Sequence, residues 1–330
     1  MSSKADVCLE TIIRLSLGAF LITTAVLKLI SIDSFELYIY SFNIFSFVST
    51  TIISRIVIAV EMWLGLWLLL LKIFYRETWL LCMSTMVAFT IFLIFAYFDK
   101  GDENCHCMGE IISMKPGHSI IKNIVIIMLL VLIKVERGDK KRRRRQWLGA
   151  GTTLVISFVI PFIIIPNDMI YNKLFSKEER LNREAFYESV NDSTYNIFLK
   201  VLPEMKEDSI IFVEEERPMN ISEGRYLINF ALAGCKYCKM GAERLSIMFD
   251  KHEIDKEKLK FVIGGGAISI STFMKMAGTQ EYGHWKIAPH KMMELTYGVF
   301  PQYVFVENGD IVFSGDFRHL DETEIIEFLK

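Results

Sequence analysis

Five apolar runs fill the first half of the chain, and shorter, more varied runs follow them. The five cover about residues 12–30, 52–71, 78–98, 119–133 and 147–165. Most are close to the roughly 20 apolar residues with which a helix crosses the hydrocarbon core of a bilayer, and the fourth is the shortest. Hydrophobic residues make up 52% of the chain, which excludes an ordinary soluble protein. The pattern predicts an α-helical transmembrane bundle of four spans and a fifth, linking span.

Beyond residue 165 the pattern changes to a polar amphipathic stretch and then to β-rich runs. Apolar positions between residues 181 and 201 predict one or two helices, which we interpret as a stalk packed on the next domain. From about residue 209, the expected strands are 210–213, 226–232, 261–263, 303–306 and 311–313. The expected helices are 239–249, 271–276 and 322–329. This alternation predicts an α/β domain built on a mixed sheet.

The distribution of basic residues predicts how the spans are oriented. Lysine and arginine crowd the link between the fourth and fifth runs, from Lys134 to Arg145. Cationic loops resist translocation, so this link and the N-terminus are expected on the cytoplasmic side of a bacterial inner membrane. The loop after the third span and everything after residue 165 are then periplasmic. We interpret the arginine run as a topology signal that also contacts lipid, and not as a nucleic-acid site.

The loop after the third span carries two thiols, Cys105 and Cys107. Two cysteines one residue apart close a small ring, so their disulfide is expected to be strained and easily reduced. The spacing suggests an oxidising couple. The alternatives are two unpaired thiols or half of a metal site that includes His106 and His118, although no metal is expected.

A second cysteine pair, Cys235 and Cys238, follows the expected strand 226–232 and opens a helix. Strand, Cys-x-x-Cys and helix in this order are typical of thioredoxin-like redox sites. The helix N-terminus favours a thiolate at Cys235, which predicts that Cys235 attacks and Cys238 resolves. A zinc site is the less favoured alternative, because no second cysteine or histidine pair at finger spacing follows.

Three ionisable residues lie within the predicted spans. Glu61 is near the middle of the second span, where a carboxylate must find a partner or hold a proton. Lys28 and Lys122 lie near the outer ends of their spans, where they could serve a function or extend to the surface. We therefore take all three as candidate site residues in the membrane. Cys8 and Cys82 are expected on the cytoplasmic side as small apolar fillers.

The membrane part resembles the MauE branch of the DoxX-like redox-associated membrane proteins over about residues 10–135. The motifs that carry the resemblance are Lys28-Leu29, Phe35, the run from Glu61 to Leu66, the loop from Cys105 to Gly109, and Lys122-Asn123. The family usually has an aromatic residue where Met108 stands. The resemblance implies a four-helix membrane bundle that serves periplasmic disulfide or electron-transfer chemistry.

The last third resembles thioredoxin over about residues 209–330. The stretch from Phe300 to Gly309 looks like the family's cis-proline, strand and hairpin turn, which implies that Pro301 abuts the active cysteines. Two departures stand out: Asn229 replaces the buried acid six residues before the first cysteine, and Gly234 replaces a tryptophan. Both argue against a general reductant.

These parts divide the chain into a bundle (1–136), a basic loop with the fifth span (137–166), a stalk (167–208) and a thioredoxin-like domain (209–330). The arrangement resembles fusions of vitamin K epoxide reductase-like bundles with thioredoxin-like domains. Tethering raises the effective concentration of one thiol site near the other to roughly millimolar for a short linker.

The sequence thus predicts a membrane-bound thiol–disulfide oxidoreductase. Cys235 would take electrons from thiols of periplasmic client proteins and pass them through Cys105 and Cys107 to a quinone. One alternative is an outward-directed reductase that receives cytoplasmic electrons at Cys8 and Cys82. The other is a non-catalytic membrane anchor or assembly factor.

Overall fold

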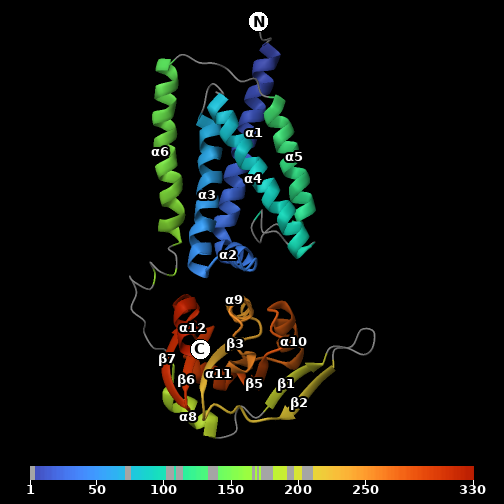
Figure 1. The fold of residues 1–330 in the computed structure, drawn as a ribbon, viewed down its shortest axis with the longest axis vertical. Coiled ribbons are helices and arrows are strands. Elements are labelled where there is room, and N and C mark those ends of the chain that lie inside the picture. The colour runs from blue at the N-terminus through green and yellow to red at the C-terminus, as the bar shows by residue number, and fades with distance from the viewer. Residues whose placement is uncertain are drawn as a thin grey trace. The chain divides into compact units, whose positions relative to one another are not determined.

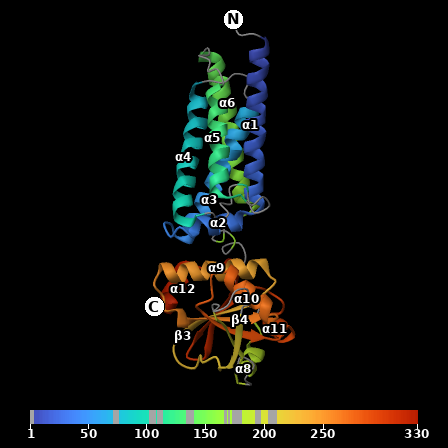
Figure 2. The same ribbon diagram turned by 90° about the vertical axis from the view of Figure 1, so that its right-hand side faces the viewer.

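The computed structural model describes residues 4–70, 76–101, 108, 114–132, 140–165, 168, 171, 181–191, 197–202 and 211–330. The chain forms two compact units, Met1–Asn167 and Asp168–Lys330. Figures 1 and 2 show that the described secondary structure of the first unit is helical and that the second unit is built on a sheet. The predicted helical bundle and α/β domain are both confirmed.

The membrane unit consists of long apolar helices and one short helix. Its elements are α1 (Lys4–Ile30), α2 (Ile32–Tyr40), α3 (Phe47–Leu70), α4 (Arg76–Lys100), α5 (Pro116–Leu132) and α6 (Lys140–Ile164). Among the described residues, Cys8–Ile30, Phe47–Leu70 and Trp79–Lys100 are long and apolar enough to cross a membrane. Pro116–Leu132 and Gly151–Ile164 are shorter apolar helices. The short α2 was not predicted, because its residues were assigned to an outer loop.

Two glycines allow α1 and α3 to pack closely. A Cβ atom added at Gly65 would lie 2.7 Å from Cγ1 of Ile22 and 2.9 Å from the carbonyl oxygen of Gly18. A Cβ atom at Gly18 would lie 3.0 Å from the carbonyl oxygen of Gly65. Small residues at such positions let the helix backbones approach, which is how membrane helices gain packing energy in a solvent as apolar as themselves.

Arg55 of α3 joins three helices through one buried guanidinium. Its side chain pairs with Glu36 of α2, and its Nη1 also donates to the carbonyl of Thr51 at 2.7 Å. Its Nε and Nη2 donate to the carbonyl oxygen of Ile165, directly after α6, at 3.3 and 3.0 Å. Unpaired helix-end carbonyls need a donor, and here a fork-shaped cation supplies two. The end of α6 is thereby fixed to α3, beside which α6 runs in Figure 1.

The second unit is a seven-stranded mixed sheet with the strand order β2-β1-β5-β4-β3-β6-β7. Its strands are β1 (Ile197–Leu202), β2 (Ile211–Glu216), β3 (Arg225–Leu232), β4 (Leu259–Gly264), β5 (Gly283–Ile287), β6 (Gln302–Glu307) and β7 (Asp310–Asp316). The strands β3, β4 and β5 are parallel, and the other pairings are antiparallel.

Helices cover both faces of this sheet, as Figure 2 shows. They are α8 (Arg183–Asn191), α9 (Lys236–Lys251), α10 (Ala267–Met276), α11 (Pro289–Thr296) and α12 (Glu322–Leu329), with two short 3₁₀ turns at Lys256–Lys258 and Phe317–His319. Side chains of α8 and α11 form one core cluster with Phe230, Val262 and Val304 of the central strands. The helices α9 and α12 contact β3 from the other face. Side chains alternate along a strand, so β3 can present side chains to helices on both faces.

The second unit differs from the predicted elements in two places. Ile197, Phe198 and Val201 were assigned to a helix of the stalk, but they lie on β1, which pairs with β2 and with β5. That prediction was wrong because a short apolar run fits either period. The strand β5 and the helix α11 were missed, since Gly-His-Trp-Lys-Ile lacks a strand-like composition and is buried by its neighbours.

We predict that Gly65→Ala destabilises the membrane unit by about 1–3 kcal/mol through overpacking against α1. Helix propensity alone would favour alanine by about 1 kcal/mol, so a loss of stability can only come from packing. Gly117→Ala in α5 is the control, because nothing lies within 4 Å of a Cβ atom there. The fraction of detergent-purified protein that stays monodisperse after heating measures the effect, and equal midpoints for the two variants would contradict it.

Candidate active site

The turn from β3 into α9 positions the first thiol. Cys235 is the N-cap of α9, with extended backbone angles (φ −85°, ψ 123°). Its sulfur accepts a hydrogen bond from the backbone N–H of Cys238 at 3.2 Å, and its own N–H donates to the carbonyl of Leu232 at 3.0 Å. A sulfur at this position takes the place that a serine or aspartate oxygen occupies at other helix starts.

The two thiols of the pair have opposite electrostatic environments. Cys235 is half-buried, and the hydrogen bond from the Cys238 thiol, aided by backbone N–H groups, lowers its pKa to about 6 despite partial burial. Burial raises the pKa of Cys238, whose sulfur accepts only a 3.4 Å hydrogen bond from the N–H of Leu232. Cys235 is therefore a thiolate at neutral pH while Cys238 keeps its proton.

Pro301 lies close to the helix that carries the thiols. The Phe300–Pro301 peptide bond is cis and precedes β6. A Cβ atom added at Gly241, three residues after Cys238, would lie 3.3 Å from Cγ of Pro301 and 2.0 Å from the hydroxyl oxygen of Tyr303. Glycine at position 241 thus lets the start of β6 approach α9 within one turn of Cys238.

Two polar side chains are buried beneath the pair, on neighbouring strands. Asn229 of β3 is directly opposite Tyr303 of β6, and both are almost fully buried. Within the described part of the chain, neither the Asn229 amide nor the Tyr303 hydroxyl has a hydrogen-bond partner. Burial raises the pKa of Tyr303. Tyr303 was missed as a site residue, although the two-residue period of β6 places it on the same face as Pro301.

A buried arginine ties α9 to the start of this unit. Arg244 of α9 pairs with Asp168 at 3.3 Å and donates to the carbonyl of Leu320 at 2.6 Å. Asp168 also pairs with Arg318 at 3.2 Å. Sequence reasoning missed this cluster because its members are 76 and 150 positions apart.

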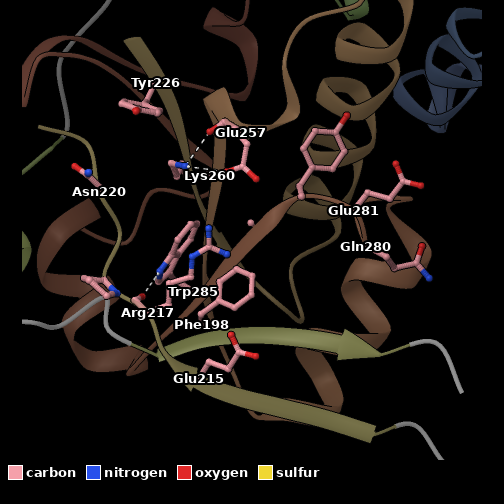
Figure 3. A pocket seen from close by; sticks show the side chains of 13 residues that line it. Phe198, Glu215, Arg217, Asn220, Tyr226, Glu257, Lys260, Gln280, Glu281 and Trp285 are labelled. Atoms are coloured by element: carbon pink, nitrogen blue, oxygen red, sulfur yellow. Dashed lines mark hydrogen bonds and ion pairs between the residues drawn. The ribbon is translucent and has the colours of Figure 1, made fainter. Parts of the chain in front are cut away.

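A concavity of about 420 Å³ lies at the face of the sheet that α8 and α11 cover, away from α9. Figure 3 shows Lys260 and Arg217 among aromatic rings. The ammonium of Lys260 lies 4.9 Å from the ring of Tyr226 and 5.4 Å from that of Trp285, while Arg217 covers Phe198. Burial lowers the pKa of Lys260. The chain's own cations already occupy these ring faces, so we assign no ligand there.

In the membrane unit, two of the candidate residues, Lys28 and Glu61, pair with each other. Lys28 of α1 donates to Glu61 of α3, and both side chains are buried. The Lys28 ammonium also lies 5.7 Å from the ring of Phe35, and Lys122 of α5 lies 5.6 Å from that of Phe20. Among the residues that the structure describes, the second carboxylate oxygen of Glu61 has no hydrogen-bond partner.

The other cysteines divide into two groups. Cys105 and Cys107 lie outside the described residues. Cys82 is buried in an apolar cluster with Leu64 and Met86, as expected of a filler, whereas Cys8 is exposed. In the described ranges, no group of three or more His, Cys, Asp or Glu side chains is arranged as metal ligands would be.

Comparison with known proteins finds a family similarity in the first part of the chain. Residues 7–135 match the family model of Methylamine utilisation protein MauE. The matched range lies within the membrane unit. This range agrees with the residues that carry the resemblance in the sequence, including the Glu61 motif and Lys122-Asn123. The reactive pair on α9 lies outside this range, in the second unit.

One curated relative covers both units. Protein TlpB of Flavobacterium psychrophilum is 27% identical over 313 residues, which are 86% of this chain and 82% of that protein. Solved structures that resemble the second unit include the thioredoxin domain of a thiol-disulfide oxidoreductase from Bacteroides vulgatus (14% identity, 41% of this chain, 93% of that chain, TM-score 0.29). StoA from Bacillus subtilis is another (16% identity, 40% and 95%, TM-score 0.27).

We predict that alkylation of Cys235 in the reduced protein rises with pH and reaches half its maximal rate near pH 6. The thiolate is the nucleophile, and the pKa of Cys235 is lowered to about 6, so the rate is lost below that pH. Cys238, whose pKa is raised, should react far more slowly throughout. Mass spectrometry of iodoacetamide-treated peptides measures both rates. A half-maximal rate of Cys235 above about pH 8 would contradict the prediction.

Proposed function

We propose that this protein is a membrane-bound thiol oxidase whose second unit takes electrons from client proteins and passes them to the membrane unit. The observation that carries the proposal is the unequal pair on α9. Cys235 is accessible and acidic, and Cys238 is buried and protonated. One thiol can therefore meet a client, while the other stays protected to close the disulfide.

The acidity of Cys235 supports the oxidising direction. Hydrogen bonds that stabilise the thiolate stabilise the reduced pair, and a stabilised reduced form makes the disulfide a stronger oxidant. Position 229, buried beneath the pair, carries an amide and not a carboxylate. Asn229 therefore cannot take the proton of Cys238 and activate the second thiol. Both features favour oxidation of client thiols by this unit over reduction of client disulfides.

The relay consists of three balanced exchanges. A client dithiol reduces the Cys235–Cys238 disulfide and becomes a disulfide itself. Cys235 then attacks a Cys105–Cys107 disulfide through a mixed disulfide, which Cys238 resolves. The Cys105–Cys107 dithiol finally gives two electrons and two protons to a membrane quinone, which becomes a quinol. Clients are periplasmic proteins with thiols, and the protein resides in the bacterial inner membrane with its second unit on the periplasmic side.

Removal of the resolving thiol should trap the relay. In a Cys238→Ser variant, nothing in the attacking unit can release the mixed disulfide, so Cys235 should accumulate in a covalent bond to a client or to the 105–107 loop. The loop adduct would appear as two protease fragments that separate only with reductant. Gel mobility before and after reduction, with mass spectrometry of the joined peptides, measures it.

The matched control adds Cys105→Ser and Cys107→Ser to the same variant. The loop adduct should then disappear while client adducts remain. Linked fragments that persist in this triple variant would show that Cys235 reacts elsewhere, with Cys82 and Cys8 as the remaining partners, and would favour the outward-directed reductase. Trapped clients without any loop adduct would reduce the membrane unit to an anchor.

The proposed orientation gives a further prediction. A reporter enzyme that is active only in the periplasm should be active when fused after Asn167 and inactive when fused at Arg143, because the basic link holds that loop in the cytoplasm. Reporter activity normalised to the amount of fusion protein measures the difference. The reverse result would place Cys235 in the cytoplasm, where disulfides are kept reduced, and would end the oxidase proposal.

A further inference from the structure

The membrane unit contains a cavity of about 280 Å³ that the thiol chemistry of the second unit leaves unexplained. Elements α1 to α5 all contribute to its wall. Its polar lining residues are Thr24, Lys28, Glu61, Lys122 and Asn123. The remainder of the wall is apolar, with aromatic rings such as Phe20, Phe35 and Phe89. A mostly apolar concavity with a few convergent polar groups is typical of small-molecule sites.

The polar groups of the cavity are costly to keep unless a ligand uses them. Lys28, Glu61 and Asn123 are each about 95% buried. The ion pair between Lys28 and Glu61 occupies one carboxylate oxygen, and the other oxygen has no partner in the described part of the chain. A buried polar atom without a partner carries a desolvation penalty that a hydrogen-bonding ligand removes.

The charges of the lining define the chemistry of that ligand. The ammonium groups of Lys28 and Lys122 and the carboxylate of Glu61 line the cavity in an apolar surrounding. Such a site favours a ligand whose oxygens accept hydrogen bonds and gain negative charge during reaction, since fixed donors act strongly where water is excluded. A lipid acyl chain would fill the apolar part and leave these groups unused.

The cavity lies in the half of the bundle to which the cysteine loop is attached. Lys28 is in the last turn of α1, while Lys122 and Asn123 lie near the start of α5. The loop with Cys105 and Cys107 joins the end of α4 at Lys100 to the start of α5 at Pro116. An acceptor of electrons from that loop therefore has a binding place on the same side of the membrane unit.

We infer that this cavity holds the ring of a lipid-soluble quinone, an inference that rests on the proposed oxidase function. The volume is near the lower end of the roughly 300–1,000 Å³ of ligand pockets, so it takes the ring and leaves the isoprenoid tail outside. Phe45 and Phe92, which are 39% and 38% exposed, line the route by which the tail leaves. Lys28, Lys122 and Asn123 supply donors for the ring oxygens.

Glu61 handles the protons of the reaction. Oxidation of the Cys105–Cys107 dithiol to a disulfide releases two electrons and two protons, and reduction of the quinone to the quinol consumes the same number. The unpaired carboxylate oxygen of Glu61 accepts the protons one at a time and passes each to a ring oxygen, while Lys28 stabilises the charge between transfers. No further oxidant is needed.

Photolabelling of the full chain in detergent tests the site directly. A short-chain azido-benzoquinone should label peptides that line the cavity, and decylubiquinone should compete. Ala88→Phe, at an exposed lining position, should reduce labelling at least tenfold by blocking the cavity. Ile91→Phe, 63% exposed and outside the lining, should leave labelling unchanged. Equal labelling of the two variants, or label outside the lining, would overturn the inference.

The role of Glu61 is tested with the other buried ion pair as the control. Glu61→Gln should slow quinol formation by the reduced protein at least tenfold, and its pH profile should flatten, with labelling retained. Glu36→Gln removes the acid that pairs with Arg55 outside the cavity and should leave the rate per folded molecule unchanged. Equal rates and pH profiles for both variants would remove Glu61 from the reaction.

Failure of this inference can be told apart from failure of the oxidase proposal. Transfer from a reduced client peptide to Cys235 and then to the 105–107 loop is measured in one turnover without quinone. If that exchange proceeds but decylubiquinone does not compete for labelling, the oxidase proposal stands and the quinone site falls. If phospholipid competes instead, the cavity is a lipid site and the inference is overturned. If labelling is specific but the exchange fails, the oxidase proposal falls.

Discussion

Charges removed from water must be paired, and this constraint governs both units of the protein. In the membrane unit, Lys28 pairs with Glu61, and Arg55 pairs with Glu36 while it also binds the carbonyl of Ile165. In the second unit, Arg244 pairs with Asp168. A buried ion pair contributes little net stability, but removal of one partner is expensive, so each pair fixes which elements must lie together.

The same constraint explains the chemistry of the cysteine pair. The Cys235 thiolate is tolerated because the thiol and N–H of Cys238 both donate toward its sulfur at the start of α9. Cys238 is fully buried and accepts only the long hydrogen bond from the N–H of Leu232, so burial dominates and it stays protonated. Two identical side chains, one turn apart, thus acquire different reactivities from position alone, and the reactive one is the one that a client can reach.

Two of the ion-paired arginines hold residues near the ends of the two units. Arg55 donates to the carbonyl of Ile165, near the end of the membrane unit. Arg244 pairs with Asp168, the first residue of the second unit. Only Pro166 and Asn167 separate these two anchored residues in the sequence. In the membrane unit, the Lys28–Glu61 pair stands at a cavity, where its unused carboxylate oxygen remains available for chemistry.

Local sequence patterns determined the apolar helices of the first unit, the Cys-x-x-Cys helix start and the strand before it, because hydrophobic period and helix capping act over a few neighbouring residues. The same patterns failed at β1 and β5, whose apolar runs are short and which pair with each other from distant parts of the sequence. Only the tertiary structure decided the partner of Glu61, 33 positions away, and that of Ile165, 110 positions from Arg55. It also placed Tyr303 beneath the thiols. Such pairings depend on which helix or strand faces which, and that choice follows from packing of the whole unit, which no local pattern contains.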